Sequence, residues 1–494
     1  MIYFFLGSVF NIIIFGYLTN RGYRNNKILE SGSDQYKMKN KKIVLIVATV
    51  GSFLTPFMVS SLNIALPDIQ AEYAADAVLL SWVVTSFLLA NAILLVPIGK
   101  VADIYGHIRI YRLGIIIFTL VSFASMFAPT IQFLLFLRVL QGIGCSMIFT
   151  TGIPILTSAF SPQERGKVLG FNVSAVYIGL SLGPFLGGIF THAFGWRSIF
   201  LIVALIGIID CFLVFSLLQP EHTKINNKKI DIIGSIIYAL TLFAIVYGSS
   251  LLPQVIGIIL MLCGIPGFIL FVKRQLTVSN PVFEIRLFRN NRVFAFSNTA
   301  ALINYAATNA VTFLLSLYLQ YIKGLTPQQA GTILIIQPII MAVLSPYTGR
   351  LSDRLEPAKL SSLGMFFSAL GLFILTFLGG NTSNVFIYCA LVVLGLGFSF
   401  FSAPNTNAIM SSVEKSNYGL ASATVATMRV LGQMMSMAVA TVIISLLIGK
   451  NQITPEYYPL FLKSIHISFM IFTVLCAVGI FFSYSRGKVH LENN

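Results

Sequence analysis

The segment GKVADIYGHIRIYR, residues 99–112, places four charged residues around two glycines, between two apolar stretches of about 20 residues each. A weaker echo, GRLSDRLEPAK, follows at residues 349–359, again between apolar stretches. A run of about 20 apolar residues is long enough to cross the hydrocarbon core of a bilayer. We therefore predict that both segments are short connections between membrane-spanning helices, and that their recurrence marks an internal repeat.

Apolar runs of this kind recur along the whole chain of 494 residues. Hydrophobic residues make up 56% of the sequence and charged residues 10%, and the mean hydropathy is +0.87. The runs are continuous, whereas the strands of a membrane barrel alternate in polarity. We predict an all-α polytopic membrane protein. Its fourteen expected spans lie near residues 43–67, 78–98, 108–129, 131–158, 166–190, 197–218, 232–250, 253–272, 293–322, 326–348, 360–379, 385–411, 418–448 and 464–484.

A further apolar stretch, MIYFFLGSVFNIIIFGYL, lies at residues 1–18. No basic residue precedes it, so it does not resemble a secretory signal. Two interpretations stay open: a fifteenth helix, or a reading frame that extends beyond an ordinary start at Met38, where MKNKKIVLIV begins.

The net charge of +16 would suggest nucleic-acid binding in a soluble protein. Its distribution indicates otherwise. When the segment before residue 43 is placed in the cytoplasm, only four of the 32 Lys and Arg residues face outside and two lie within spans. This is the positive-inside bias. We expect a multi-pass protein of the cytoplasmic membrane, with a cytoplasmic C-terminus and no nucleic-acid partner.

The sequence has no pattern typical of an active site. The five cysteines lie inside spans without metal-ligand spacing, and the five histidines are scattered. No phosphate-binding loop or nucleophile elbow is found, and the longest polar connections are only about 20 residues long. We predict no catalytic residues, no metal and no cofactor.

Several segments resemble signatures of the major facilitator superfamily. The segment GKVADIYGHIRIYR resembles its loop signature, RVLQGIG (138–144) resembles that of the fourth helix, and GLSLGPFLGG (179–188) resembles the antiporter signature of the fifth helix. Four other segments are similar to the 14-helix drug:proton antiporters of EmrB/QacA type: IDIIG, NPVFEIRLFRNNRVFA, SWVVTSFLLA and ATMRVLGQ.

The resemblance implies two six-helix halves with two inserted helices between them. The expected parts are an N-terminal extension (1–42), an N-terminal half (43–220), an inserted helix pair with its loops (221–292), a C-terminal half (293–485) and a cytoplasmic tail (486–494). It implies a monomeric secondary active transporter that exports drugs or other small amphipathic molecules in exchange for protons, by alternating access.

The charged loop and its echo are expected at the cytoplasmic gate. The residues concerned are Gly99, Asp103, Gly106, Arg109, Arg112, Gly349, Asp353 and Arg354. The glycines permit tight turns. Asp103 can pair with Arg109 or Arg112, and the resemblance implies a contact with the helix that begins near Asn417. The alternative for this loop is a plain topology anchor, but an acid adds nothing to such an anchor.

In the fifth span, Gly179, Gly183 and Gly187 recur every four residues, with Pro184 and Gly188 beside them. Small residues at this spacing form a flat stripe for close helix packing, and proline permits a bend. The resemblance favours a hinge and a leak-tight contact over plain packing.

Four polar residues inside spans are candidates for coupling: Arg138, Gln141, Asp210 and Arg429. A cation in hydrocarbon needs a partner or a wet cavity, so Arg138 is expected to face the interior, in a structural role or on a transport path. Arg429 invites the same argument. Seven polar residues are candidates for the wall of a substrate cavity: Asn63, Asn298, Tyr305, Asn309, Gln337, Asn405 and Asn407.

The sequence departs from the family in the first span. Many members have an acid there, but in FMVSSLNIALP its place is taken by Met58. Asp210 is the only acid well inside a span. A dedicated exporter of a neutral or anionic metabolite is therefore a second interpretation. A transporter-like sensor or a membrane enzyme is a third, but neither an added soluble domain nor a cluster of carboxylates is found.

Overall fold

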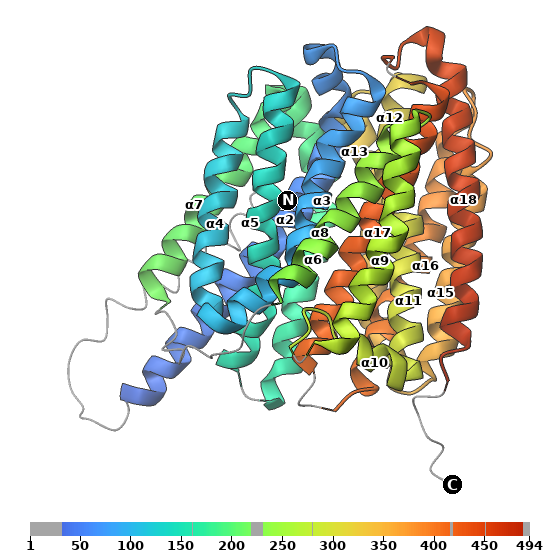
Figure 1. Ribbon diagram of the computed structural model, residues 1–494. Coiled ribbons are helices and arrows are strands. Elements are labelled where there is room, and N and C mark those ends of the chain that lie inside the picture. The colour runs from blue at the N-terminus through green and yellow to red at the C-terminus, as the bar shows by residue number, and fades with distance from the viewer. Residues whose placement is uncertain are drawn as a thin grey trace.

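The computed structural model describes residues 32–160, 162–218, 231–278, 280–414, 418–449 and 451–487. All regular structure in these residues is helical, and fourteen helical stretches are long and apolar enough to cross a membrane (Figure 1). The predicted all-α polytopic fold is confirmed. The apolar stretch at residues 1–18 lies outside the described residues.

The first six membrane helices pack into one bundle. They are α2 (Gly32–Tyr73), α3 (Ala77–Tyr105), α4 (His107–Ser125), α5 (Ile131–Ala159), α6 (Pro162–Phe194) and α7 (Arg197–Leu217). Helix α2 lies along α6, while α5 packs against α3 and α4, and α7 against α4.

The last six spans pack in a similar way. They comprise α11 (Arg292–Thr308), α12 (Ala310–Leu317), the π-helical turn η1 (Tyr318–Ile322), α13 (Pro327–Leu334), α14 (Ile336–Ser352), α15 (Pro357–Leu375), α16 (Asn384–Ser411), α17 (Tyr418–Leu447) and α18 (Tyr458–Tyr484), with the short turn η3 (Pro455–Tyr457) before α18. Helix α16 packs against α14 and α15, and α11 against α17 and α18. The two bundles meet where α3 contacts α17, α6 contacts α13, and α2 contacts α12.

Between the bundles in sequence lie α8 (Ile232–Ser250), α9 (Val255–Thr277) and the short α10 (Ile285–Asn290). Helices α8 and α9 pack on each other, and α8 also contacts α3 and α17, at the seam between the bundles. The buried Asp231 side chain begins α8 by accepting a hydrogen bond from the Gly234 amide (2.9 Å). The same carboxylate oxygen accepts two hydrogen bonds from Arg274 at the end of α9 (2.8 and 2.7 Å).

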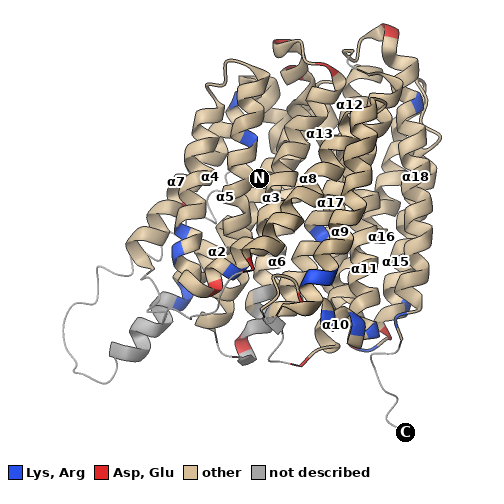
Figure 2. Cartoon of the chain, viewed as in Figure 1, with Lys and Arg blue, Asp and Glu red and all other residues tan. Residues whose placement is uncertain are grey.

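Lys and Arg residues gather at one end of the bundle, called here the basic end (Figure 2). Helix α10 and the C-terminal end of α18 lie there (Figure 1). The connection between α2 and α3 lies at the opposite end, where Glu72 lies in the last turn of α2 and Asp76 caps α3.

The expected spans differ from the helices mainly at their ends. The span expected at 43–67 lies within α2, which runs from Gly32 to Tyr73. Backbone hydrogen bonds continue into polar residues at the bilayer surface, so hydropathy underestimates helix length. The span expected at 293–322 is divided into α11, α12 and η1, and the span expected at 326–348 into α13 and α14. Hydropathy alone carries no sign of these breaks.

Candidate substrate site

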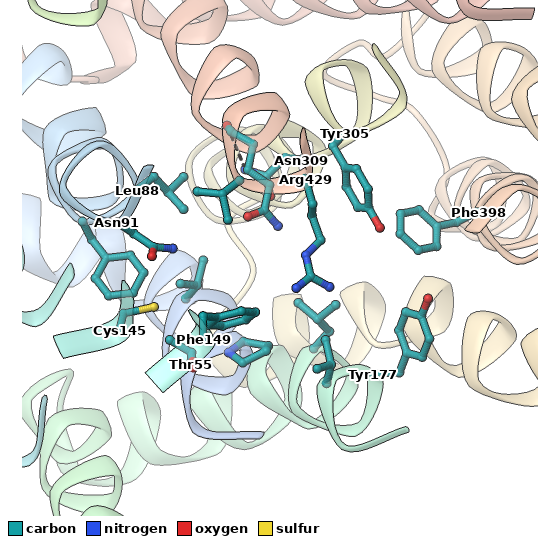
Figure 3. A pocket seen from close by; sticks show the side chains of 17 residues that line it. Thr55, Leu88, Asn91, Cys145, Phe149, Tyr177, Tyr305, Asn309, Phe398 and Arg429 are labelled. Carbon is teal, nitrogen blue, oxygen red and sulfur yellow. Dashed lines mark hydrogen bonds between the residues drawn. The ribbon is translucent and has the colours of Figure 1, made fainter. Parts of the chain in front are cut away.

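A cavity lies at mid-depth between the two bundles. Its volume is about 70 Å³, and the wider space between its walls amounts to about 630 Å³ when the open solvent at its mouth is included. Both bundles contribute to its wall (Figure 3). The lining residues are Thr55, Pro56, Val59, Phe87, Leu88, Asn91, Cys145, Phe149, Val176, Tyr177 and Leu180 from the first bundle, and Tyr305, Asn309, Phe398, Arg429, Val430 and Gln433 from the second.

Arg429 is the charged residue of this wall. It projects from α17 toward the middle of the cavity, with Phe149 on one side and Tyr305 on the other (Figure 3). Its guanidinium carbon lies 5.2 Å from the centre of the Phe149 ring. Among the described residues, no hydrogen bond or ion pair joins Arg429 to another side chain, and no Asp or Glu lines the cavity. The cavity is therefore positively charged and partly aromatic.

Aromatic side chains of both bundles meet around Phe398. The rings of Tyr305 and Tyr177 contact it edge-on, with centroids 5.6 and 6.3 Å away. The Tyr177 and Ser402 hydroxyls share a hydrogen bond of 2.7 Å, which links α6 to α16. The amide nitrogen of Asn309 donates to the Gln433 carbonyl (3.4 Å). These contacts hold the aromatic wall in place and do not engage the guanidinium of Arg429.

Arg138, the other arginine inside a span, lies behind the cavity wall. It is fully buried, and its Nε donates to the Val83 carbonyl (3.0 Å), while its Nη1 donates to the Gln141 side chain. Its guanidinium also covers the Phe87 ring at 4.3 Å. Gln141 in turn donates to Ser122 (2.7 Å). Arg138 and Gln141 thus tie α5 to α3 and α4.

Asp210 lies outside the cavity, between three helices. It is fully buried on α7, and the Tyr111 hydroxyl of α4 donates to its carboxylate (2.7 Å). The same hydroxyl lies 3.0 Å from the Val47 carbonyl of α2. This position joins helices of the first bundle.

Two of the seven cavity candidates, Tyr305 and Asn309, line the cavity. Asn63 lies instead on the seam between α2 and α12, where its carbonyl accepts a hydrogen bond from Ser316 (2.7 Å). Gln337 is partly buried on α14 and does not line the cavity. Neither placement could be read from the sequence, because the sequence does not show how each helix is rotated about its axis.

The other three candidates lie nearer the basic end and do not line this cavity. Asn298 is buried and donates to the Phe294 carbonyl (2.9 Å). Asn405 is buried and accepts a hydrogen bond from Arg486 (2.9 Å). Asn407 donates to Ser352 Oγ (2.9 Å) and to Asp353 (3.1 Å). These amides bond within the second bundle, so they are engaged away from the cavity.

In the charged loop, the expected pairing of Asp103 with Arg109 or Arg112 is not formed. Asp103 faces His107 at 3.6 Å. Arg112 instead donates to the Leu218 carbonyl at the end of α7 and covers the Phe215 ring at 4.8 Å. A guanidinium satisfies the free carbonyls at a helix C-terminus. The contact expected near Asn417 falls outside the described residues.

The two glycines of this loop differ in their surroundings. Gly106 connects α3 to α4 with φ of +100°, a backbone angle that favours glycine. At Gly99 a Cβ atom would meet only Thr150, at 3.9 Å. Gly349 in the echo is similarly open, with Ala403 at 3.7 Å, and Arg354 in the same segment is exposed.

The glycine stripe of α6 lies against α2. A Cβ atom on Gly179 would lie 2.6 Å from the Phe53 carbonyl oxygen, and one on Gly187 would lie 2.8 Å from the Cα of Ser61. Ser61 donates to the Gly183 carbonyl (3.0 Å). Distances under 3 Å leave no room for a side chain, so this pair of helices depends on glycine. Pro184 and Gly188 face α13 of the second bundle, at the end of the molecule opposite the basic end.

Cross-bundle hydrogen bonds close the seam between the cavity and the end opposite the basic end. Ser316 donates to Asn63, Gln320 donates to the Ile64 carbonyl (2.9 Å), and Tyr321 of η1 donates to Gln70. These bonds connect α2 to the stretch that runs from α12 into η1.

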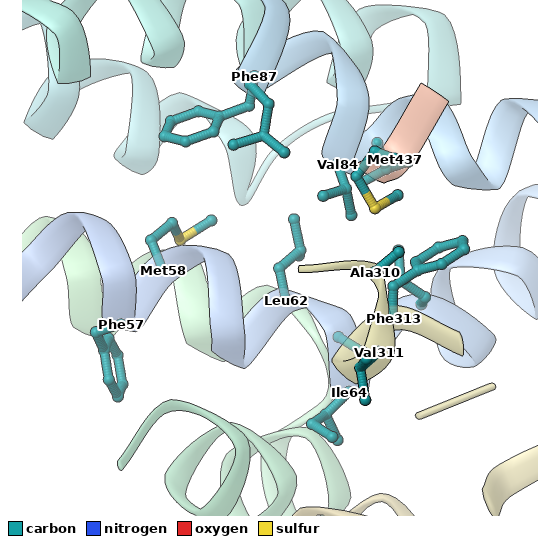
Figure 4. Close-up of a cluster of buried hydrophobic side chains, with 14 of the residues drawn as sticks. Phe57, Met58, Leu62, Ile64, Val84, Phe87, Ala310, Val311, Phe313 and Met437 are labelled. Carbon is teal, nitrogen blue, oxygen red and sulfur yellow. The ribbon is translucent and has the colours of Figure 1, made fainter. Parts of the chain in front are cut away.

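Met58 is fully buried in an apolar cluster on this seam (Figure 4). The cluster combines Leu62 and Phe87 of the first bundle with Val311 and Met437 of the second. An acid at position 58 would be buried among these apolar groups. In this chain, the Met58 side chain fills the position and packs against the apolar cluster.

Most polar residues of the cavity wall are not among those that the sequence predicts. Thr55, Asn91, Tyr177 and Gln433 lie in spans whose surroundings are apolar. Gln433 follows Arg429 by one helical turn within ATMRVLGQ, and this spacing was the available signal.

Two helical bundles that enclose a cavity at mid-depth define the architecture of a secondary membrane transporter. The sequence profile described as Major Facilitator Superfamily matches residues 48–437 and, in a second overlapping match, residues 298–490. The chain belongs to this superfamily and is a membrane transporter.

Similar proteins include transporters with different names. The riboflavin transporter RibZ of Clostridioides difficile (strain 630) is 31% identical over 448 residues, which cover 90% of this chain and 97% of RibZ. The multidrug resistance protein Stp of Mycobacterium tuberculosis (strain CDC 1551 / Oshkosh) is 29% identical over 409 residues, which cover 81% of this chain and 76% of Stp. Neither similarity identifies the molecule that this chain carries.

Solved structures share the fold at low identity. A bacterial homologue of the human lysosomal transporter Spinster, in an inward-facing and unoccupied conformation, matches with a TM-score of 0.66 and 15% identity, covering 90% of this chain and 97% of that one. The nucleoside transporter NupG matches with a TM-score of 0.61 and 13% identity, covering 90% and 99%.

Proposed function

We propose that this protein exports a small amphipathic molecule from the cytoplasm, with the cavity opening alternately to the two sides of the membrane. The observation that carries the proposal is the cavity wall itself, because both bundles contribute to it at mid-depth. Relative movement of the bundles would then expose a bound molecule to one side or the other.

In this proposal the basic end faces the cytoplasm, as the positive-inside bias favours. The hydrogen bonds from Ser316, Gln320 and Tyr321 then close the external side. The drug:proton antiport that the sequence signatures favour is part of the proposal. Coupling would use the charged loop with Asp103, the antiporter helix α6 or the buried Arg138.

A dedicated metabolite exporter is the second candidate. The free guanidinium of Arg429 and the lack of a carboxylate in the described cavity wall favour an electron-rich or anionic substrate over a cationic drug. RibZ, at 31% identity, is named as a transporter of riboflavin, which makes a planar aromatic substrate a reasonable choice for a first assay.

Two experiments test the proposal. The chain is expressed in an efflux-deficient bacterial host, and survival is measured against a chemically diverse toxicant panel. Everted vesicles from the same cells are then assayed for uptake of riboflavin and of any toxicant that scores, with and without an imposed pH gradient. Leu180→Trp, which fills the cavity, is the inactive control.

We expect uptake that depends on the protein and is lost in Leu180→Trp. Uptake that does not respond to the pH gradient would rule out proton antiport and leave the proposal of a transporter intact. If Leu180→Trp transports as well as the parent, the cavity is not the path.

A further inference from the structure

The two arginines inside spans differ in burial and in hydrogen bonding. Arg138 is buried behind the wall and bonded to the Val83 carbonyl and to Gln141. Arg429 is only partly buried and points into the cavity (Figure 3). A cation at this depth is unfavourable unless it faces a partner or a wet cavity, and such residues mark transport paths. Arg429 therefore has its bonding capacity free for a molecule in the cavity.

The surroundings of Arg429 select the shape of that molecule. Phe149 lies under the guanidinium, and the rings of Tyr305, Tyr177 and Phe398 form the far wall. Aromatic rings on two sides of a cavity favour an aromatic ligand, which packs against them edge-on or offset-stacked.

The surroundings also select its charge. The described lining has no Asp or Glu that could attract a cationic ligand or neutralise Arg429. Its polar side chains include the Asn91, Asn309 and Gln433 amides and the Tyr305 hydroxyl, which can donate hydrogen bonds to a ligand. The Thr55 hydroxyl already donates to the Gly51 carbonyl (3.1 Å), and the Tyr177 hydroxyl is paired with Ser402 (2.7 Å). A guanidinium binds carboxylates and phosphates in a forked geometry that lysine does not provide.

We infer that Arg429 is the anion-binding residue for a planar aromatic substrate that carries a carboxylate or a similar anionic group. This inference rests on the proposed function, because it assigns the substrate class of the same cavity. It makes the protein selective against the cationic aromatic compounds that a cavity with a carboxylate would bind.

The test compares three naphthalene probes of nearly equal size: 1-naphthoate, 1-naphthamide and 1-naphthylmethylammonium. Binding to the purified full-length protein in lipid nanodiscs is measured by titration calorimetry and by naphthalene fluorescence. We expect naphthoate to bind most tightly and the ammonium probe most weakly. Arg429→Gln should weaken naphthoate binding by about tenfold to a hundredfold and change naphthamide binding by less than about threefold.

Two variants make the result specific. Arg292→Gln removes an exposed guanidinium that lies over Phe296 outside the cavity, so it changes the net charge equally and should leave the probe order intact. Arg429→Lys keeps the charge but loses the fork, so it should restore only part of the naphthoate affinity. If Arg429→Gln does not give monodisperse protein, Arg429→Lys serves as the test variant in its place.

Three results would overturn the inference: equal affinity for the carboxylate and ammonium probes, an unchanged probe order in the Arg429 variants, or no binding of any probe. The proposed function is judged separately by uptake in vesicles. Suppose that the vesicles take up all three probes equally and that Leu180→Trp abolishes this uptake. That result would contradict the inference about Arg429 and would support the proposal of a transporter.

Discussion

The carbonyl oxygen of Pro327 lies 2.5 Å from the position that a Cβ atom on Gly188 would occupy. Gly188 belongs to α6 in the first bundle and Pro327 begins α13 in the second. A reciprocal contact lies nearby, because a Cβ atom on Gly331 would collide with the Pro184 carbonyl oxygen. The two bundles thus touch backbone to backbone at the end opposite the basic end.

Gly188→Ala should weaken this closure. Backbone cannot move aside as a side chain can, so the added methyl should destabilise the closed seam by about 1–3 kcal/mol. We expect accessibility from that side to increase and transport to fall by about tenfold, measured by labelling of a cysteine introduced at the buried seam residue Val311 and by vesicle uptake. Gly170→Ala is the matched control, since nothing lies within 4 Å of its added methyl.

Gly183→Leu should abolish transport by forcing α2 and α6 apart. A Cβ atom on Gly183 would collide with the Ser60 hydroxyl and lie 3.1 Å from the Phe57 carbonyl oxygen. Leu182→Ala, at a partly buried neighbouring position, should be mild. Uptake and the amount of folded protein are measured for both. Equal behaviour of the two variants would show that the stripe is not a close-packing surface.

Asp103→Asn should leave the protein folded but reduce transport by about tenfold or more. The carboxylate is 60% exposed and faces His107 at 3.6 Å, so it contributes little to this conformation. Its proposed contribution lies in the state in which the basic ends of the bundles meet. Normal uptake together with normal expression would return this loop to the role of topology anchor. Lys100→Gln, in the same loop, is the control.

Asp210→Asn should preserve transport driven by a pH gradient. The residue lies outside the cavity, and an amide can keep the hydrogen bond to Tyr111. Tyr111→Phe should lower thermal stability more, because it removes contacts to both Asp210 and Val47. The measurement is vesicle uptake with and without the gradient. Loss of gradient-driven uptake with intact downhill exchange in Asp210→Asn would make Asp210 the proton carrier.

Asp231→Asn should lower the free energy of unfolding at neutral pH by about 1–3 kcal/mol. Burial alone would raise the pKa of Asp231, but hydrogen bonds from Arg274, the Gly234 amide and Gln275 outweigh it and hold the pKa below the ordinary value of 3.8. A lowered pKa contributes stability above that value, and the contribution is lost as the pH falls through the folded-state pKa.

The stability difference between the parent and Asp231→Asn should therefore be constant from about pH 5 to 8 and shrink below about pH 4. Thermal unfolding monitored across this range is the measurement. Lys273→Gln, at an exposed neighbouring position, should change neither quantity. A difference that persists undiminished at about pH 3 would contradict the role assigned to the ionised carboxylate.

The amino-acid sequence by itself determined the helical class and the number of spans in the part of the chain that the structure describes. Hydrocarbon leaves no partner for an unpaired backbone amide, so every long apolar run must form a helix, and its length follows from the bilayer. The close contact of α2 and α6 was also predictable in part, because the spacing of Gly179, Gly183 and Gly187 marks a surface for close helix packing.

Only the tertiary structure decided which polar side chains reach the cavity. Arg138 and Arg429 are equivalent in sequence, since each is a lone cation in an apolar span, yet one is bonded within its bundle and the other is open to the cavity. A membrane helix is apolar on its lipid face and on its packed face alike, so its periodicity does not mark the interior. Its rotation is set by the side chains of neighbouring helices, which come from distant parts of the chain.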